Sequence, residues 1–253
     1  MKKKYASRFL YLLVILFPAS SFTNYGEKYY ATKEAANKCI KIELTDGSLG
    51  SGLFFLHRDT VYLITAKHVI FNLKGLKASY AMIKHFGNDA KNNYSNISTL
   101  DLSLALRLSL IKNIEGLDAV AIKIAHSAKK EIKHQPVYSF LPVYKNLVRP
   151  NTHINLVSKP YCSKQEYLNY GTEILLSGFP IELKTPGSFP TNFDINKPLV
   201  RSGIISGFNR KENTIITDAT VYHGNSGGPV FAVTSIDGQS IMNRGIQFIG
   251  IAI

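Results

Sequence analysis

Apolar and polar residues alternate along many short stretches of this chain, and almost no stretch shows a helical repeat. Residues 40–45 follow the period-two pattern of a strand with one buried face. Apolar runs at 53–56 and 61–64 flank four polar residues and predict a β-hairpin. Further strands are expected at 102–110, 119–124, 173–177, 199–202, 204–206, 214–217, 230–233 and 247–251. Many short strands separated by Gly and Pro are typical of an all-β protein, built as a barrel or a sandwich.

Three segments depart from this pattern. Residues 27–39 predict a short amphipathic helix, and residues 84–99, rich in Asn and Lys, predict a surface loop. Residues 126–165 carry charges, four prolines and little periodicity, so they are expected to connect two halves of the chain. The length of 253 residues fits one all-β unit or two small subdomains.

The N-terminus is typical of a secretory signal peptide at residues 1–21. A basic start is followed by an apolar run, Phe9 to Pro18, and then by the small residues Ala19, Ser20 and Ser21. The run is too short for a convincing membrane span, although an uncleaved N-terminal anchor is the alternative. We therefore expect a secreted or periplasmic protein with no stable membrane span after cleavage.

Charge and cysteine content exclude several classes of function. Without residues 1–21 the formal net charge falls from +13 to +9, but the basic residues are scattered, so nucleic-acid binding is not expected. Cys39 and Cys162 have no metal-ligand spacing, and whether they pair is open. There is no HExxH motif and the histidines are dispersed, so neither a metal nor a cofactor is expected.

The strongest local signal is the segment from Gly224 to Pro229, in which Ser226 is flanked by glycines. Such a turn exposes a serine hydroxyl, and the N–H groups of Gly224 and Ser226 can then form an oxyanion hole. An ordinary Gly-rich turn is the alternative interpretation.

Two further residues fit the same chemistry. His68 lies just past an apolar run, and Asp118 opens another apolar stretch, where a buried carboxylate requires a partner. A serine becomes a nucleophile when a base takes its proton, and the base needs a carboxylate that fixes its tautomer. The sequence therefore predicts a triad of His68, Asp118 and Ser226. Asp101 also precedes an apolar stretch and is the alternative carboxylate.

From about Gly50 to its end the chain resembles the trypsin-like serine peptidases, and among them the bacterial HtrA-like branch. The matching blocks are Gly50 to Leu53, Thr65 to Val69, Asp118 to Ala121, Ser177 to Pro180, Arg201 to Ser206, Thr217 to Ala219 and Gly224 to Pro229. The resemblance favours Asp118 over Asp101. It implies a serine endopeptidase that acts on proteins or peptides through an acyl-enzyme intermediate. A secreted binding protein that kept the fold and lost activity is the alternative, against which the intact triad speaks.

The resemblance also implies two antiparallel β-barrels of the chymotrypsin type with the active site between them. The expected organisation is a signal peptide at 1–21, an N-terminal segment at 22–38, a first barrel at 39–125, a connector at 126–165 and a second barrel at 166–253. His68 and Asp118 would come from the first barrel and Ser226 from the second.

The chain departs from the family in ways that bear on regulation and specificity. No PDZ-like extension follows the peptidase region, and Asn225 stands where many animal enzymes have an aspartate that captures a new N-terminus. By family position Thr220 lies at the base of the specificity pocket and His223 at its rim. Without an acid at position 220 a Lys or Arg preference is not expected, and short apolar or acidic side chains remain open.

The C-terminal strand at 247–251 is the one that, in the family, runs beside the active site and pairs with substrate. Family members usually add another strand that closes the second barrel, whereas only Ala252 and Ile253 follow here. We therefore expect the second barrel to be incomplete. Either the natural chain extends past Ile253, or a partner, self-association or the N-terminal segment covers this edge.

Overall fold

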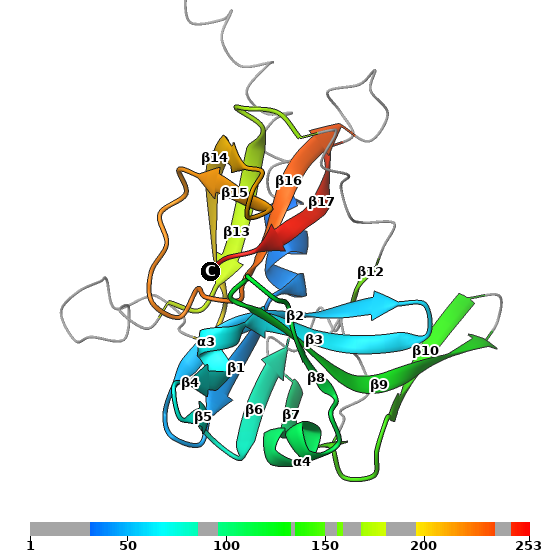
Figure 1. The fold of residues 1–253 in the computed structure, drawn as a ribbon. Helices are drawn as coiled ribbons and strands as arrows, with labels where there is room; N and C mark the ends of the chain where they lie inside the picture. Colours follow the sequence, from blue (N-terminus) through cyan, green and yellow to red (C-terminus); the bar gives the residue numbers. More distant parts are fainter. Residues whose placement is uncertain are drawn as a thin grey trace, which may run out of the picture.

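A computed structural model describes residues 31–85, 96–132, 135–149, 156–158, 168–180, 196–235 and 244–253. In these residues the chain forms two curled β-sheets, one above the other in Figure 1, with short helices at their margins. The signal peptide expected at 1–21 and Cys162 lie outside the described residues. The all-β prediction and the two-barrel arrangement are confirmed.

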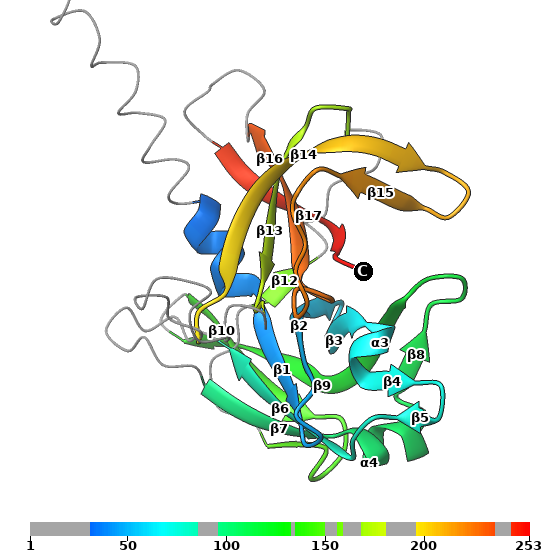
Figure 2. The same cartoon turned by 90° about the vertical axis from the view of Figure 1, so that its left-hand side faces the viewer.

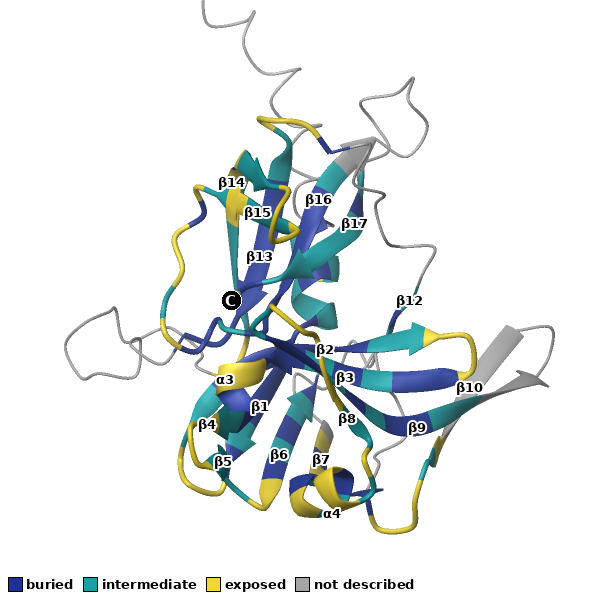
Figure 3. Cartoon of the chain, viewed as in Figure 1, coloured by how far each residue is buried: buried dark blue, intermediate teal, exposed yellow. Residues whose placement is uncertain are grey.

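The first sheet has the strand order β10-β9-β3-β2-β1-β6-β7-β11, with β12 added to β2 and β8 added to β9. Its strands are β1 (Ile40–Leu44), β2 (Leu49–His57), β3 (Thr60–Ala66), β6 (Tyr80–His85), β7 (Asn96–Asp101), β8 (Ile111–Asn113), β9 (Ala119–Ile132), β10 (Gln135–Pro142), β11 (Val148–Arg149) and β12 (Leu156–Ser158). The short helix α3 (Lys67–Ile70) and the two-stranded ribbon β4 (Phe71–Asn72) and β5 (Gly75–Leu76) follow β3. The sheet curls around an apolar core, and Figure 3 shows its buried residues in dark blue.

The predicted hairpin and the first predicted strand are both present. Residues 53–56 and 61–64 lie in β2 and β3, which pair antiparallel across a tight turn in which Arg58 has a φ of 57°. In β1 the apolar side chains of Ile40, Ile42 and Leu44 are buried, as the period-two pattern predicts, but Lys41 on the opposite face is buried too, at 4% exposure. Strands β6 and β7 extend into the predicted loop at 84–99, and residues 86–95 lie outside the described part.

The strand predicted at 102–110 is wrong, because this segment begins with the helix α4 (Leu102–Arg107). The Asp101 carboxylate accepts a hydrogen bond from the Leu104 N–H at 2.7 Å, which is a typical N-terminal cap. Leu102 and Ala105, three residues apart, are both buried. The cap and this helical spacing therefore override the leucines at every second position from 102 to 110, a repeat that is typical of a strand.

Residues 126–165, expected to be a connector, contribute strands to the first sheet. Strand β9 continues to Ile132, β10 pairs with it along its whole length, and β12 adds a short parallel pairing to β2. Pro136 and Pro142 lie in β10, which is the edge strand of the sheet. Proline is tolerated at a sheet edge, which explains why this strand lacks a strand-like sequence.

The second sheet has the order β15-β14-β13-β16-β17. Its strands are β13 (Glu173–Gly178), β14 (Leu199–Asn209), β15 (Thr214–Thr217), β16 (Pro229–Ser235) and β17 (Arg244–Ile251). The strands expected at 199–202 and 204–206 form one continuous strand, β14. Figure 2 shows the long β14 and β15 curling over β13, and β16 and β17 on its other side.

A separate apolar cluster joins the two sheets. It combines Leu53 of β2 with Leu175 of β13 and Phe231 of β16, and the Phe231 ring meets Phe248 at a centroid distance of 6.0 Å. Ala31 and Ala35 belong to the same cluster and lie on a helix whose described part spans 31–38. The helix predicted at 27–39 is confirmed over residues 31–38, and it lies beside the junction of the sheets (Figure 2).

Candidate active site

His68 and Asp118 lie together because of the register between β3 and β9. Ala66 pairs with Ala119, so Lys67 and Asp118 are the next residues on the two adjoining strands. The Lys67 N–H donates to the Asp118 carbonyl at 3.1 Å, and the His68 N–H donates to Asp118 Oδ1 at 3.0 Å. His68 Nδ1 is hydrogen-bonded to Asp118 Oδ2. The carboxylate thus holds both the backbone and the ring of His68, on the exposed turn α3 that is yellow in Figure 3.

The electrostatics of this pair favour an ionised carboxylate. Partial burial acts to raise the pKa of Asp118, but hydrogen bonds from the His68 side chain and backbone, together with the nearby charges of His68 and Lys67, outweigh it. The pKa of Asp118 is therefore below its usual range. An ionised Asp118 keeps the His68 Nδ1 as a donor, which leaves Nε2 as the nitrogen that can accept a proton.

Asp101 has a different role. Its carboxylate caps α4 and it pairs with Tyr80 in the register of β6 and β7. Of the two aspartates that the sequence offers as partners of His68, the structure brings Asp118 to it and places Asp101 on the helix cap.

Ser226 lies in the second of two consecutive tight turns between β15 and β16. The Asn225 N–H donates to the Tyr222 carbonyl at 3.0 Å, and Gly224, at the third position of that turn, has a φ of 92°. This combination is typical of a type II turn, whose third position favours glycine. Gly227 has a φ of 84° in the next turn, which the Gly228 N–H closes onto the Asn225 carbonyl at 2.8 Å.

These turns leave two neighbouring backbone donors available. In the part of the chain that the structure describes, neither the Gly224 N–H nor the Ser226 N–H donates to a backbone carbonyl. Two N–H donors of one turn that have no backbone acceptor can together bind an oxygen atom of a ligand. These are the two groups predicted as an oxyanion hole.

The Ser226 turn packs against the strand that leads to His68. A side chain at Gly227 would collide with the Ser51 carbonyl and with Thr65, and its Cβ would lie 2.8 Å from the Ala66 nitrogen, two residues before His68. The Ser226 side chain is partly exposed, and among the described residues its hydroxyl makes no hydrogen bond to His68. The turn therefore reaches the strand end that carries His68, while the hydroxyl remains available.

Thr220 and His223, predicted at the specificity pocket, lie on the segment between β15 and the Ser226 turn and are both exposed. The Thr220 carbonyl accepts a hydrogen bond from Arg201 Nη1 at 2.7 Å, and the Arg201 guanidinium lies 3.8 Å from the centre of the Tyr222 ring. The role of Arg201 in holding this segment was missed from the sequence, where it is one residue of a matching block without a chemical signal of its own.

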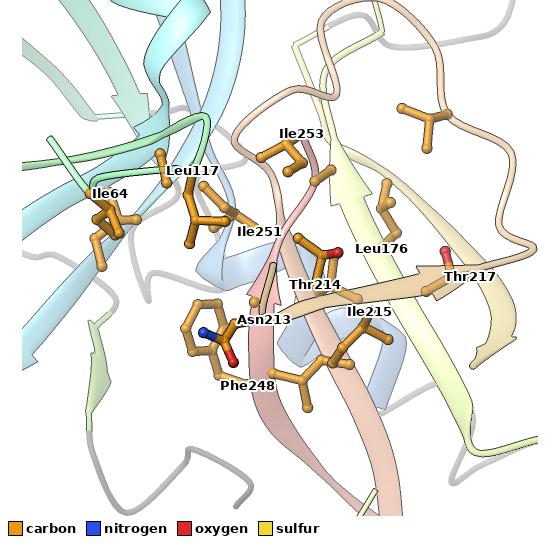
Figure 4. Close-up of a pocket in the computed structure, with 17 residues that line it drawn as sticks. Ile64, Leu117, Leu176, Asn213, Thr214, Ile215, Thr217, Phe248, Ile251 and Ile253 are labelled. Carbon is orange, nitrogen blue, oxygen red and sulfur yellow. The ribbon is translucent and has the colours of Figure 1, made fainter. Parts of the chain in front are cut away.

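Val221, which follows Thr220 in the sequence, lines an apolar pocket of about 380 Å³ that lies between the barrels. Figure 4 shows Ile64 and Leu117 of the first barrel on one side, Leu176 and Thr217 of the second on the other, and Ile251 between them. Leu117 adjoins Asp118, so the pocket lies beside the candidate catalytic pair.

No helix in the described residues is long and apolar enough to cross a membrane. Cys39 is buried, which raises the pKa of its thiol and leaves it unreactive.

Among solved structures, 294 chains match this chain, whereas no curated protein matches it. One is the crystal structure of the serine endoprotease from Yersinia pestis, with 19% identity, a TM-score of 0.48, and coverage of 92% of this chain and 63% of that chain. Another is the crystal structure of Deg5, with 16% identity, a TM-score of 0.48 and coverage of 90% of each chain. This chain thus spans 63% of the length of the Yersinia pestis structure. The family model named trypsin matches residues 29–251, and the chain therefore belongs to the trypsin family of serine peptidases.

Proposed function

We propose that this protein is a serine endopeptidase in which Ser226 is the nucleophile, His68 the general base and Asp118 the group that orients His68. The observation that carries the proposal is the hydrogen bonding of Asp118 to both the ring and the backbone of His68. A histidine held in one tautomer by an ionised carboxylate is the arrangement that activates a serine hydroxyl.

In the proposed reaction the Ser226 hydroxyl attacks the carbonyl carbon of the scissile peptide bond while His68 Nε2 takes its proton. The carbonyl oxygen becomes negatively charged and accepts hydrogen bonds from the N–H groups of Gly224 and Ser226. His68 then gives its proton to the leaving amine, and an acyl-enzyme on Ser226 remains. Water, deprotonated by His68, attacks this ester, and the carboxylic acid product leaves with Ser226 restored.

Labelling with a fluorophosphonate probe tests this proposal directly. The wild-type protein should be labelled on the peptide that contains Ser226, with or without a chelator, and should cleave a denatured protein substrate. Ser226→Ala should lose the label and lower kcat on the order of 10⁴–10⁶-fold. Ser206→Ala, at an exposed serine on β14, is the control and should change neither. A folded wild-type protein that is not labelled and cleaves nothing would instead indicate a binding protein that kept the fold.

The sequence leaves open whether the substrate residue before the cleaved bond is apolar or acidic. We propose that it is apolar. Val221, next to Thr220, lines the apolar pocket between the barrels, and Leu117 beside Asp118 lines it too. An apolar pocket favours an apolar group because burial removes the apolar surface of both from water. Mapping the cleavage sites in a mixed peptide library tests this, and cleavage mainly after Asp or Glu would contradict it.

Export and self-association are further parts of the proposal. The basic and apolar N-terminus supports secretion or delivery to the periplasm, and finding the mature protein beginning near Phe22 outside the cytoplasm would test it. Strand β17 is an edge of the second sheet, and unpaired strand edges favour association with another chain. Light scattering of the purified protein measures its oligomeric state, and a monomer at all concentrations would contradict self-association through this edge.

A further inference from the structure

Ser51, on β2 of the first barrel, reaches across to the turn of the second barrel that carries Ser226. Its side chain is fully buried, at 0% exposure. The Ser51 hydroxyl donates a hydrogen bond to the Gly224 carbonyl at 2.6 Å, and the Ser51 N–H donates to the Ser226 carbonyl at 2.9 Å. One residue thus holds the carbonyls of both residues whose N–H groups form the proposed oxyanion hole.

The direction of the Ser51 hydroxyl is itself fixed. The Phe179 N–H donates to Ser51 Oγ at 2.9 Å, so one lone pair of this oxygen is occupied and its proton is directed at Gly224. On the backbone side, the Thr65 hydroxyl donates to the Ser51 carbonyl at 2.7 Å. Ser51 is therefore held by both barrels, and its hydroxyl donates to the Gly224 carbonyl.

The hydrogen bonds of Ser51 act on alternate peptide groups of the turn. In the peptide between Gly224 and Asn225, Ser51 binds the C=O while the N–H donates to Tyr222. In the peptide between Ser226 and Gly227, Ser51 binds the C=O while the N–H donates to the Ala252 carbonyl at 2.7 Å. A peptide group bonded at both ends cannot rotate without breaking a hydrogen bond and leaving a polar group without its partner, which is unfavourable.

The orientation of two further peptide groups follows from these. The peptide that carries the Ser226 N–H lies between the two fixed peptides, and its own carbonyl, that of Asn225, accepts the Gly228 N–H at 2.8 Å. The peptide that carries the Gly224 N–H directly precedes the first fixed peptide. The Ser226 N–H is therefore fixed from both sides and the Gly224 N–H from one, and neither has a backbone acceptor among the described residues. We propose that Ser51 is a positioning residue that sets the oxyanion hole from the opposite barrel. This inference rests on the proposed function, and Ser51 itself does not touch the substrate.

The test compares Ser51→Ala with Ser98→Ala in the full chain. Ser98 is also a buried serine of the first barrel, at 2% exposure, and its hydroxyl has no hydrogen-bond partner among the described residues. For each variant the rate of inactivation by the fluorophosphonate probe is measured over a range of probe concentrations and pH values. This separates the limiting rate, kinact, from the binding constant, KI.

Ser51→Ala should lower kinact about 10- to 100-fold, which is no more than the loss of rate when one oxyanion-hole donor is removed. KI should change by no more than about threefold. The shape of the pH profile should stay that of the wild type, because the His68–Asp118 pair is untouched. Ser98→Ala should change neither constant. An unchanged kinact in a folded Ser51→Ala protein overturns the proposal, and so does a loss that resides in KI.

Two further measurements keep the inference testable. Ser51→Cys fills the space of the hydroxyl with a weak donor and should reproduce the loss in kinact. If neither variant folded, Ser51 would be a structural residue and the proposal would be wrong. Hydrogen exchange of the segment 219–228 needs no activity and should be faster in Ser51→Ala than in Ser98→Ala. A wild-type protein that the probe does not label would refute the proposed peptidase function, while this exchange measurement would still decide the role of Ser51.

Discussion

Two aspartates of this chain each precede an apolar stretch, and the residues that follow decide the role of each carboxylate. After Asp101 the chain turns into α4, so the carboxylate accepts the Leu104 N–H and is used as a cap. After Asp118 the chain enters β9, whose register with β3 brings the carboxylate to His68. The sequence predicted both residues as candidates, but local composition could not separate them because the difference lies in a pairing between distant strands.

Replacing each aspartate by asparagine separates these roles by activity. Asp118→Asn should lower kcat by about 10⁴-fold, because the amide N–H₂ facing Nδ1 stabilises the wrong tautomer of His68. Asp101→Asn should leave kcat close to that of the wild type, since asparagine is an equally good helix cap. Steady-state hydrolysis of a peptide that the wild type cleaves is the measurement. Loss of activity in Asp101→Asn with a normal Asp118→Asn protein would reverse the assignment.

The lowered pKa of Asp118 also predicts how stability depends on pH. A carboxyl whose pKa is lower in the folded chain stabilises the fold above its unfolded pKa, and this stabilisation is lost as the pH falls through the folded value. The melting temperature of the wild type should therefore exceed that of Asp118→Asn near pH 6, and the difference should shrink towards pH 2–3. A difference between the two proteins that is constant with pH, or that grows in acid, would contradict this.

Whole elements were predicted well where the repeat of apolar residues matches the fold, and poorly where a helix cap or a sheet edge overrides that repeat. Strand β1 follows from alternation, and the β2–β3 hairpin follows from two apolar runs on either side of four polar residues. The run at 102–110 has a leucine at every second position and was predicted as a strand. The helix cap that Asp101 provides could have identified α4. Strand β10 was missed because its sequence carries prolines, which an edge strand tolerates.

The Asp101 cap of α4 predicts a change in stability that leaves the candidate active site intact. Asp101→Ala removes the acceptor of the Leu104 N–H and should lower the free energy of unfolding by about 0.5–2 kcal/mol. Asp101→Asn should lower it by much less, and neither variant should alter labelling of Ser226 in the folded protein. Urea denaturation followed by circular dichroism measures the free energy of unfolding. Equal stability of the alanine and asparagine variants would show that the cap contributes little.

At the scale of the whole molecule, the candidate site depends on the joint between the barrels. His68 and Asp118 come from the first barrel and Ser226 from the second, and Ser51 and Gly227 are the points at which the barrels meet beside them. The sequence predicted the residues of the triad through local motifs. It could not predict the joint, because residues such as Ser51 carry no signal of their contact with a turn 173 positions further along the chain.

The helix at 31–38 belongs to this joint, which bears on how the N-terminus affects activity. Ala31 and Ala35 are buried in the cluster that joins the sheets, and Lys38 Nζ donates to the Leu156 carbonyl at 2.8 Å. Asn225 is buried at 1% exposure and neutral, so it cannot neutralise a buried N-terminal ammonium as a carboxylate would. The N-terminal segment therefore acts on stability, and no trimmed end is expected to switch activity on.

Chains that start at Phe22 and at Cys39 test this expectation. The chain from Phe22 should be labelled by the fluorophosphonate probe, whereas the chain from Cys39 should melt at a lower temperature because it lacks the buried alanines. Each kcal/mol of lost stability lowers the melting temperature by about 2–4 °C in a chain of this size. Ala35→Glu in the longer chain should reproduce the loss, and Lys33→Glu, exposed on the same helix, should not. An inactive chain from Phe22 that becomes active only when trimmed to one specific residue would show that a new N-terminus does activate this protein.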